Sequence, residues 1–192
     1  MATSPQPRIS PQEYVALEQQ LGGKYEYRDG QMFAMAGVSL PHGRIQVNLT
    51  RRVDEALSDS PCNVYPADVR VVIEAADMAT YPDLSIVCSP EQQAKAFGHS
   101  ITNPTVLFEV LSPSTQAYDR GAKFDQYRKL ASLREYVLVS QYAMVVDLYR
   151  LENSQWVFHP LRGEDAVLSL NSAGIEIPLR DIYRGVRFED AE

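Results

Sequence analysis

The sequence predicts an α/β domain with a mixed central sheet flanked by helices and extra antiparallel strands in its C-terminal third. Two patterns carry this prediction. Apolar runs rich in Val, Ile and Leu recur through the middle of the chain, as buried strands require, and stretches with a helical period lie between them. With 192 residues, 45% of them hydrophobic, the chain can bury one substantial core. We therefore expect a single domain over 1–192, with its core at about 10–185.

The first expected elements are a short helix in SPQEYVALEQQLGG (10–23) and a hairpin in KYEYRDGQMFAM (24–35). Ser10 suits the N-cap, Pro11 the first helical position, and Glu13 completes a capping box. Asp-Gly in the middle of the second stretch is a dipeptide that a tight hairpin turn favours. A second, amphipathic helix is predicted in PHGRIQVNLTRRVDEALS (41–58), where apolar residues recur at helical spacing.

Three β-rich runs follow, and we expect them to be the central strands of one sheet: NVYPADVRVVIE (63–74), YPDLSIVCS (81–89) and PTVLFEVLS (104–112). A helical period over 117–133 and the run EYVLVS (135–140) then predict a strand, helix, strand unit, which implies a parallel crossover. The alternating segments in 144–179 predict antiparallel strands that extend or cover the sheet, and a short turn closes them.

Composition narrows the class of protein. Lys and Arg total 18 against 25 Asp and Glu, and the net charge of -7 argues against a broad basic surface that coats nucleic acid. No stretch approaches the roughly 20 apolar residues that span a bilayer, so we expect a cytoplasmic protein without a membrane partner. The only cysteines, Cys62 and Cys88, have no zinc-site spacing and are interpreted as free buried thiols in a reducing compartment.

Two carboxylates stand out because each interrupts an apolar strand. Alternation places Glu109 on the same face as Leu111, and Asp83 rises from the strand before it. If neighbouring strands bring these acids together, their repulsion is best relieved by a divalent cation, and oxygen ligands suit Mg²⁺ or Mn²⁺. The alternative is a purely structural ion pair with Lys123, Arg70 or Arg120.

The order of several segments resembles the Uma-type restriction endonuclease family of the PD-(D/E)XK nuclease superfamily. They are YEYRDGQMFAM, HGRIQVNL, YPDLSIVC, FEVLSPSTQAYDRGAKFDQYRKL and LREYVLVS, and the match covers roughly 10–185. The resemblance implies a restriction-endonuclease-like fold. It also implies Mg²⁺-dependent hydrolysis of DNA phosphodiester bonds, in which Asp and Glu hold the metal and Lys acts on the attacking water.

Carried onto this chain, the resemblance implies that Asp83 and Glu109 are catalytic metal ligands. The superfamily expects a lysine two residues after the acid, where this sequence has Leu111. Lys123 is the predicted replacement: it falls on the inward stripe of the helix that follows, and family members carry a lysine there. Glu26 matches a further acid of the family and is a candidate metal ligand.

Substrate contacts are predicted more broadly. His42 matches a family histidine and could contact substrate, although helix capping or surface exposure would also explain it, and Arg120 is the second candidate. DNA phosphates would need a local basic rim, which a homodimer could double. The candidates for that rim are Arg44, Arg51, Arg52, Arg120, Arg128 and Lys129. The alternative function is a catalytically silent nuclease-fold protein that binds nucleic acid or a partner protein.

Overall fold

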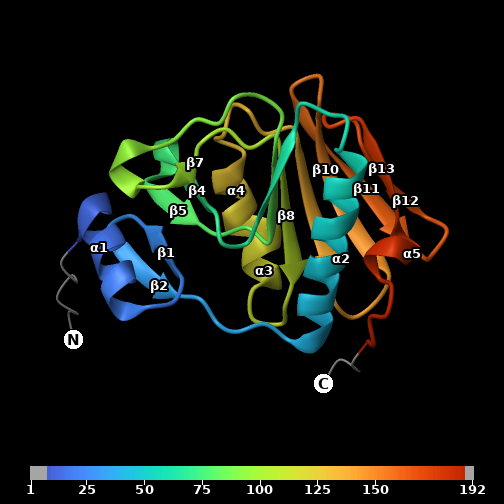
Figure 1. Ribbon diagram of the computed structural model, residues 1–192, viewed down its shortest axis with the longest axis horizontal. Coiled ribbons are helices and arrows are strands. Elements are labelled where there is room, and N and C mark those ends of the chain that lie inside the picture. Colours follow the sequence, from blue (N-terminus) through green and yellow to red (C-terminus); the bar gives the residue numbers. More distant parts are fainter. Residues whose placement is uncertain (1–7, 189–192) are drawn as a thin grey trace.

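A computed structural model describes residues 8–188, and its largest element is a mixed six-stranded sheet (Figure 1). In spatial order its strands are β11 (Gln155–Arg162), β10 (Val145–Glu152), β9 (Glu135–Ser140), β8 (Val106–Leu111), β6 (Leu84–Val87) and β3 (Asn63–Pro66). β8 and β9 are parallel and the other neighbours are antiparallel. The predicted α/β class with a mixed sheet is confirmed.

A five-stranded sheet and a hairpin complete the β structure. The five strands are β2 (Gln31–Ala34), β1 (Tyr25–Arg28), β5 (Met78–Thr80), β4 (Arg70–Ile73) and β7 (Ser100–Ile101). The hairpin is β12 (Val167–Leu170) with β13 (Ile175–Pro178). The helices are α1 (Pro11–Leu21), α2 (Leu40–Ala56), α3 (Gln116–Tyr118), the π turn η3 (Asp119–Lys123), α4 (Phe124–Tyr127), α5 (Leu179–Ile182) and the single 3₁₀ turns η1 (Glu74–Ala76) and η2 (Lys95–Phe97).

The structure confirms three local predictions: the capping box, the hairpin turn and the parallel crossover. Ser10 and Glu13 make the reciprocal bonds of a capping box at the start of α1. The β1–β2 turn has positive φ at Asp29 (55°) and Gly30 (80°), the conformation that makes Asp-Gly favourable in a tight hairpin. The crossover from β8 through α3, η3 and α4 to β9 is parallel, as expected.

The central strands β6, β8 and β9 are buried on both faces of the six-stranded sheet, because almost all of their side chains on either face are apolar. α2, the β12–β13 hairpin and α5 cover one face, where α2 packs on β8 through Ile45 and Leu49 (Figure 1). α4 covers the other face together with part of the five-stranded sheet. Leu107 and Leu111 lie on this second face, so Glu109 between them faces the junction of the two sheets.

The structure of residues 63–74 contradicts the prediction that they belong to one central sheet. The chain turns after β3, and the amide of Val69 bonds back to the carbonyl of Pro66. β3 therefore ends as the edge of the six-stranded sheet, whereas β4 pairs with β5 and β7 in the five-stranded one. A continuous β-rich run does not reveal this, because either half satisfies the same strand pattern.

The prediction of two free thiols is also wrong, because Cys62 and Cys88 form a disulfide. Cys62 comes directly before β3 and Cys88 directly after β6, and the register pairs Asn63 with Val87. One step further along this antiparallel pair places the two cysteines opposite each other. Nothing in their spacing of 26 residues shows that register. Among the helices of the described part of the chain, none has the length and apolar character to cross a membrane.

Candidate active site

The two predicted acids meet because β6 and β8 are antiparallel neighbours. Leu84 pairs with Phe108, so one step further Asp83 stands opposite Glu109 on the same face of the sheet. The Oδ2 atom of Asp83 accepts a hydrogen bond of 2.6 Å from the amide of Val110. Both carboxylates line a cavity of about 650 Å³ at the junction of the two sheets.

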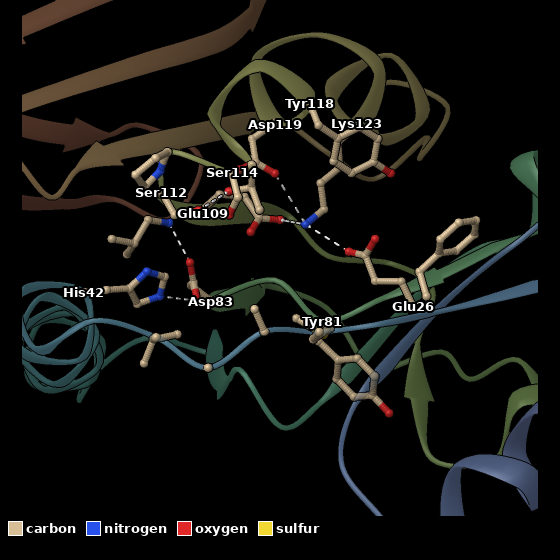
Figure 2. Close-up of a pocket in the computed structure, with 18 of the residues that line it drawn as sticks. Glu26, His42, Tyr81, Asp83, Glu109, Ser112, Ser114, Tyr118, Asp119 and Lys123 are labelled. Carbon is tan, nitrogen blue, oxygen red and sulfur yellow. Dashed lines mark hydrogen bonds and ion pairs between the residues drawn. The ribbon is translucent and has the colours of Figure 1, made fainter. Parts of the chain in front are cut away.

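Lys123 lies close to this pair of acids, as it must if it replaces the lysine expected at position 111. Figure 2 shows its ammonium group between the carboxylates, with Nζ 2.7 Å from Oε1 of Glu109 and 3.2 Å from Oε1 of Glu26. Asp119 lies 3.7 Å away on the same π turn. The lysine side chain is only 5% exposed, so all of these interactions act in a poorly solvated environment.

The π turn changes which residues face inward. A regular helix would put Arg120 on the stripe of Lys123, but a π turn accommodates an extra residue and shifts the stripe to Asp119, Lys123 and Tyr127. Arg120 instead points outward and pairs with Asp147, and it does not line the cavity. Regular helical spacing would have turned Arg120, a predicted substrate contact, toward the cavity, and the structure contradicts that placement.

Burial and charge together set the protonation of the cluster. Burial of Glu109 raises its pKa to about 8 against the pull of Lys123, with Asp119 and Asp83 adding to the rise. Burial likewise raises the pKa of Asp119. Burial also disfavours the charged forms of Glu26 and Lys123, but their attraction for each other outweighs it. The pKa of Glu26 is lowered by the ammonium group of Lys123, and the pKa of Lys123 is held well above its usual value by the surrounding acids. Without a metal, Lys123 is charged while the acids around it compete for ionisation.

Asp83 is fixed by two side chains from α2. Its Oδ1 atom lies 3.0 Å from Nε2 of His42 and accepts a bond of 2.6 Å from the side-chain amide of Gln46. These residues are one helical turn apart, so they present both groups on one face. His42 is buried and Ser39 caps the helix, so neither capping nor exposure explains the histidine.

Glu26 comes from the other sheet. It lies on β1, accepts a hydrogen bond from the Thr80 hydroxyl on β5, and contacts the ammonium group of Lys123 directly. Of the three predicted metal ligands, the five-stranded sheet therefore supplies Glu26 and the six-stranded sheet supplies Asp83 and Glu109, so the site exists only when both sheets are packed together.

The acids fit a hard divalent cation. The Oε1 atom of Glu109 is occupied by Lys123 and the Tyr127 hydroxyl, while Oε2 accepts no hydrogen bond from residues 8–188. Oδ2 of Asp83 accepts one bond and keeps acceptor capacity. Within 8–188 no three His, Cys, Asp or Glu side chains form a ready ligand set. Water or phosphate oxygens would complete the coordination, as is usual for Mg²⁺.

Most of the predicted basic rim lies elsewhere. None of the six candidates lines the main cavity, and Arg51 lines a hollow that adjoins it. Arg52 pairs with Glu55 and Asp181, and Arg128 pairs with Asp125. The alternative ion-pair partner Arg70 binds Glu18.

Sequence reasoning missed three polar contacts of the cluster: Asp119, Tyr127 and Gln46. Each is four residues from a predicted site residue on the same helical segment, and this spacing was the available signal. Tyr127 donates to Glu109 over 2.7 Å.

Comparison with known proteins identifies the family and the fold. The Uma2 family, described as "Putative restriction endonuclease", matches residues 11–180. An uncharacterized protein of Synechocystis is 36% identical over 97% of both chains, and a second one is 30% identical over 83% of this chain and 90% of its own. The crystal structure of a "putative nuclease" from Anabaena variabilis superposes with a TM-score of 0.69 at 17% identity, covering 91% of this chain and 97% of that one, so the fold is shared. The chain belongs to the Uma2 family of putative restriction endonucleases.

Proposed function

We propose that the protein is a divalent-metal-dependent nuclease that hydrolyses phosphodiester bonds of DNA at Asp83, Glu109 and Lys123. The observation that supports this most strongly is the 2.7 Å contact between Lys123 and Glu109 beside Asp83, at the wall of an open cavity. A structural ion pair alone would not need a second acid opposite Glu109.

The residues take distinct tasks in this proposal. A bound Mg²⁺ or Mn²⁺ would supply Lewis acidity, lowering the pKa of a water and neutralising phosphate charge. Asp83 and Glu109 would hold it, with Glu26 as a further acid of the cluster. Lys123 is protonated at neutral pH because the acids around it raise its pKa, so it donates hydrogen bonds to the water or the phosphate oxygens instead of accepting a proton.

A cleavage assay tests the proposal. Supercoiled plasmid and single-stranded DNA are incubated with Mg²⁺ or Mn²⁺ and wild type, Asp83→Asn, Lys123→Met or Asp125→Asn. The control Asp125 lies on α4, pairs with Arg128 and does not line the cavity. We expect both site variants to lose about a hundredfold or more in rate, as removal of one electrostatic stabiliser does elsewhere, and the control to keep full activity.

The alternative is a silent nuclease-fold binding protein. If folded wild type binds DNA but leaves every substrate intact in both metals, that alternative holds and the nuclease proposal fails. Circular dichroism on each variant separates lost chemistry from lost folding.

The remaining parts of the proposal concern context. We propose that the protein acts in the cytoplasm on DNA and that a homodimer joins two sites. Light scattering coupled to gel filtration gives the mass in solution. Thiol labelling during lysis reports whether Cys62 and Cys88 are reduced in the cell, since disulfides are rare in a reducing cytoplasm.

A further inference from the structure

One face of the β1–β2 hairpin turns into the active-site cavity. Tyr27 points to the core under α1, so its neighbours Glu26 and Arg28 point the opposite way. Phe33 pairs with Glu26 across the hairpin and lines the same cavity. The hairpin therefore places an arginine and an aromatic ring beside an acid of the site.

Arg28 lies against two aromatic rings. The centre of its guanidinium group lies 3.9 Å from the Phe33 ring and 4.8 Å from the ring of Tyr118, which comes from α3. Stacking fixes the plane of a guanidinium group but leaves the donors at its edge free. A fixed plane with free edge donors suits an anionic oxygen in a defined position.

Two polar atoms of this arrangement are shielded from solvent and unsatisfied. Nε of Arg28 and the hydroxyl of Tyr118 have no hydrogen-bond partner within residues 8–188. The Nε atom lies 3.9 Å from Oε2 of Glu26, beyond hydrogen-bond distance. Buried donors without partners are costly, so a missing ligand is a physical explanation for them.

The charges of the cavity also favour Arg28 as the group that binds an anion. Its described lining includes the acids Glu26, Asp83, Glu109 and Asp119, which would repel a DNA strand. Lys123 is engaged by three of these acids. Arg28 is the other permanently charged cation of the described lining; it forms a long ion pair with Glu26, and its Nε donor makes no hydrogen bond within residues 8–188.

We propose that Arg28 and the Tyr118 hydroxyl form the phosphate-binding subsite of this centre and hold a non-bridging oxygen of the substrate strand. The inference rests on the proposed nuclease function. Arg28 takes the place that the sequence assigned to Arg120, whose guanidinium group is committed to Asp147 outside the cavity. Its stacking supplies the orientation that a flexible surface arginine lacks.

Binding without cleavage tests the subsite. The probe is a labelled single-stranded oligonucleotide of about 12 residues, within the range that single-strand sites cover. Anisotropy is measured in Ca²⁺ across a salt series. We expect Arg28→Gln to weaken binding roughly tenfold and to reduce the salt slope by about 0.7, the value for one phosphate contact on a single strand. Tyr118→Phe removes the hydroxyl but keeps the aromatic ring and leaves the charge of Arg28 in place. We therefore expect the affinity to fall severalfold while the salt slope stays unchanged.

Arg128→Gln is the matched control. Arg128 also stacks on an aromatic ring, at 5.4 Å from that of Phe124, and carries the same charge, but it does not line the cavity. We expect its affinity to stay close to that of wild type. If Arg28→Gln and Arg128→Gln have equal affinities and slopes while wild type cleaves DNA, the subsite is refuted and the nuclease stands.

A thermal-shift measurement with inorganic phosphate tests the opposite case, in which the nuclease proposal fails and the subsite stands. If wild type binds DNA without cleaving it, phosphate raises its melting temperature, and Arg28→Gln and Tyr118→Phe lose that shift, the subsite stands without the nuclease. If wild type does not bind DNA, a subsite for the substrate strand is refuted even where phosphate binds. If neither DNA nor phosphate binds to wild type, the subsite is refuted as well.

Discussion

Metal binding should displace a proton from Glu109. Burial raises the pKa of this carboxyl to about 8, with Asp119 and Asp83 adding to the rise, whereas a metal requires the ionised form. At about two pH units below that pKa, removing the proton costs about 2.7 kcal/mol. Affinity for Mn²⁺ should therefore rise about fiftyfold between about pH 6 and pH 8, the pH at which half of the Glu109 carboxyl groups are ionised.

Calorimetry measures this coupling directly. Mn²⁺ is titrated at about pH 7 in two buffers of different protonation enthalpy, and the difference in apparent binding enthalpy gives the number of protons released. Wild type should release close to one proton. Glu109→Gln should bind more weakly and release none, while Asp125→Asn, outside the cavity, should match wild type.

The outcome that refutes this reasoning is specific. If Mn²⁺ binds wild type with the same affinity at both pH values and without proton release, Glu109 is either already ionised or not a ligand. In that case the raised pKa does not govern the metal site.

Three further predictions follow from the contacts. In the metal-free protein, the raised pKa of Glu109 contributes stability that is present below about pH 4.5 and lost as pH rises through about 8; denaturant titration should show this loss, and Glu109→Gln should flatten it. The disulfide between Cys62 and Cys88 closes 26 residues, so reduction should cost about 3.5 kcal/mol and lower the melting temperature by roughly 7–14 °C; an unchanged value contradicts this. Gln46→Leu removes a donor to Asp83, so Mn²⁺ affinity should fall about tenfold or more in calorimetry while the fold persists; unaltered affinity would remove Gln46 from the site.

The sequence alone determined the elements whose causes are local. The capping box of α1, the Asp-Gly turn and the apolar alternation around Glu109 depend on neighbours a few residues away, so their patterns are visible in the chain. Alternation also placed Glu109 correctly on the face of Leu111. The resemblance added Lys123 as a candidate, and the structure puts its ammonium group beside that acid.

Errors arose where one inserted residue or one strand pairing changes what faces inward. The π turn moved the inward position from Arg120 to Asp119, because an extra residue rotates the stripe that a regular helix would present. The run 63–74 divided between two sheets, although both halves have the same strand pattern.

Only the tertiary structure decided which distant residues meet. The register of β6 on β8 sets Asp83 opposite Glu109, and the register of β3 on β6 sets Cys62 opposite Cys88. Packing of the second sheet then brings Arg28 and its acid neighbour to the cavity. Register is chosen by the burial of whole strand faces, a property of the packed molecule that no single segment contains.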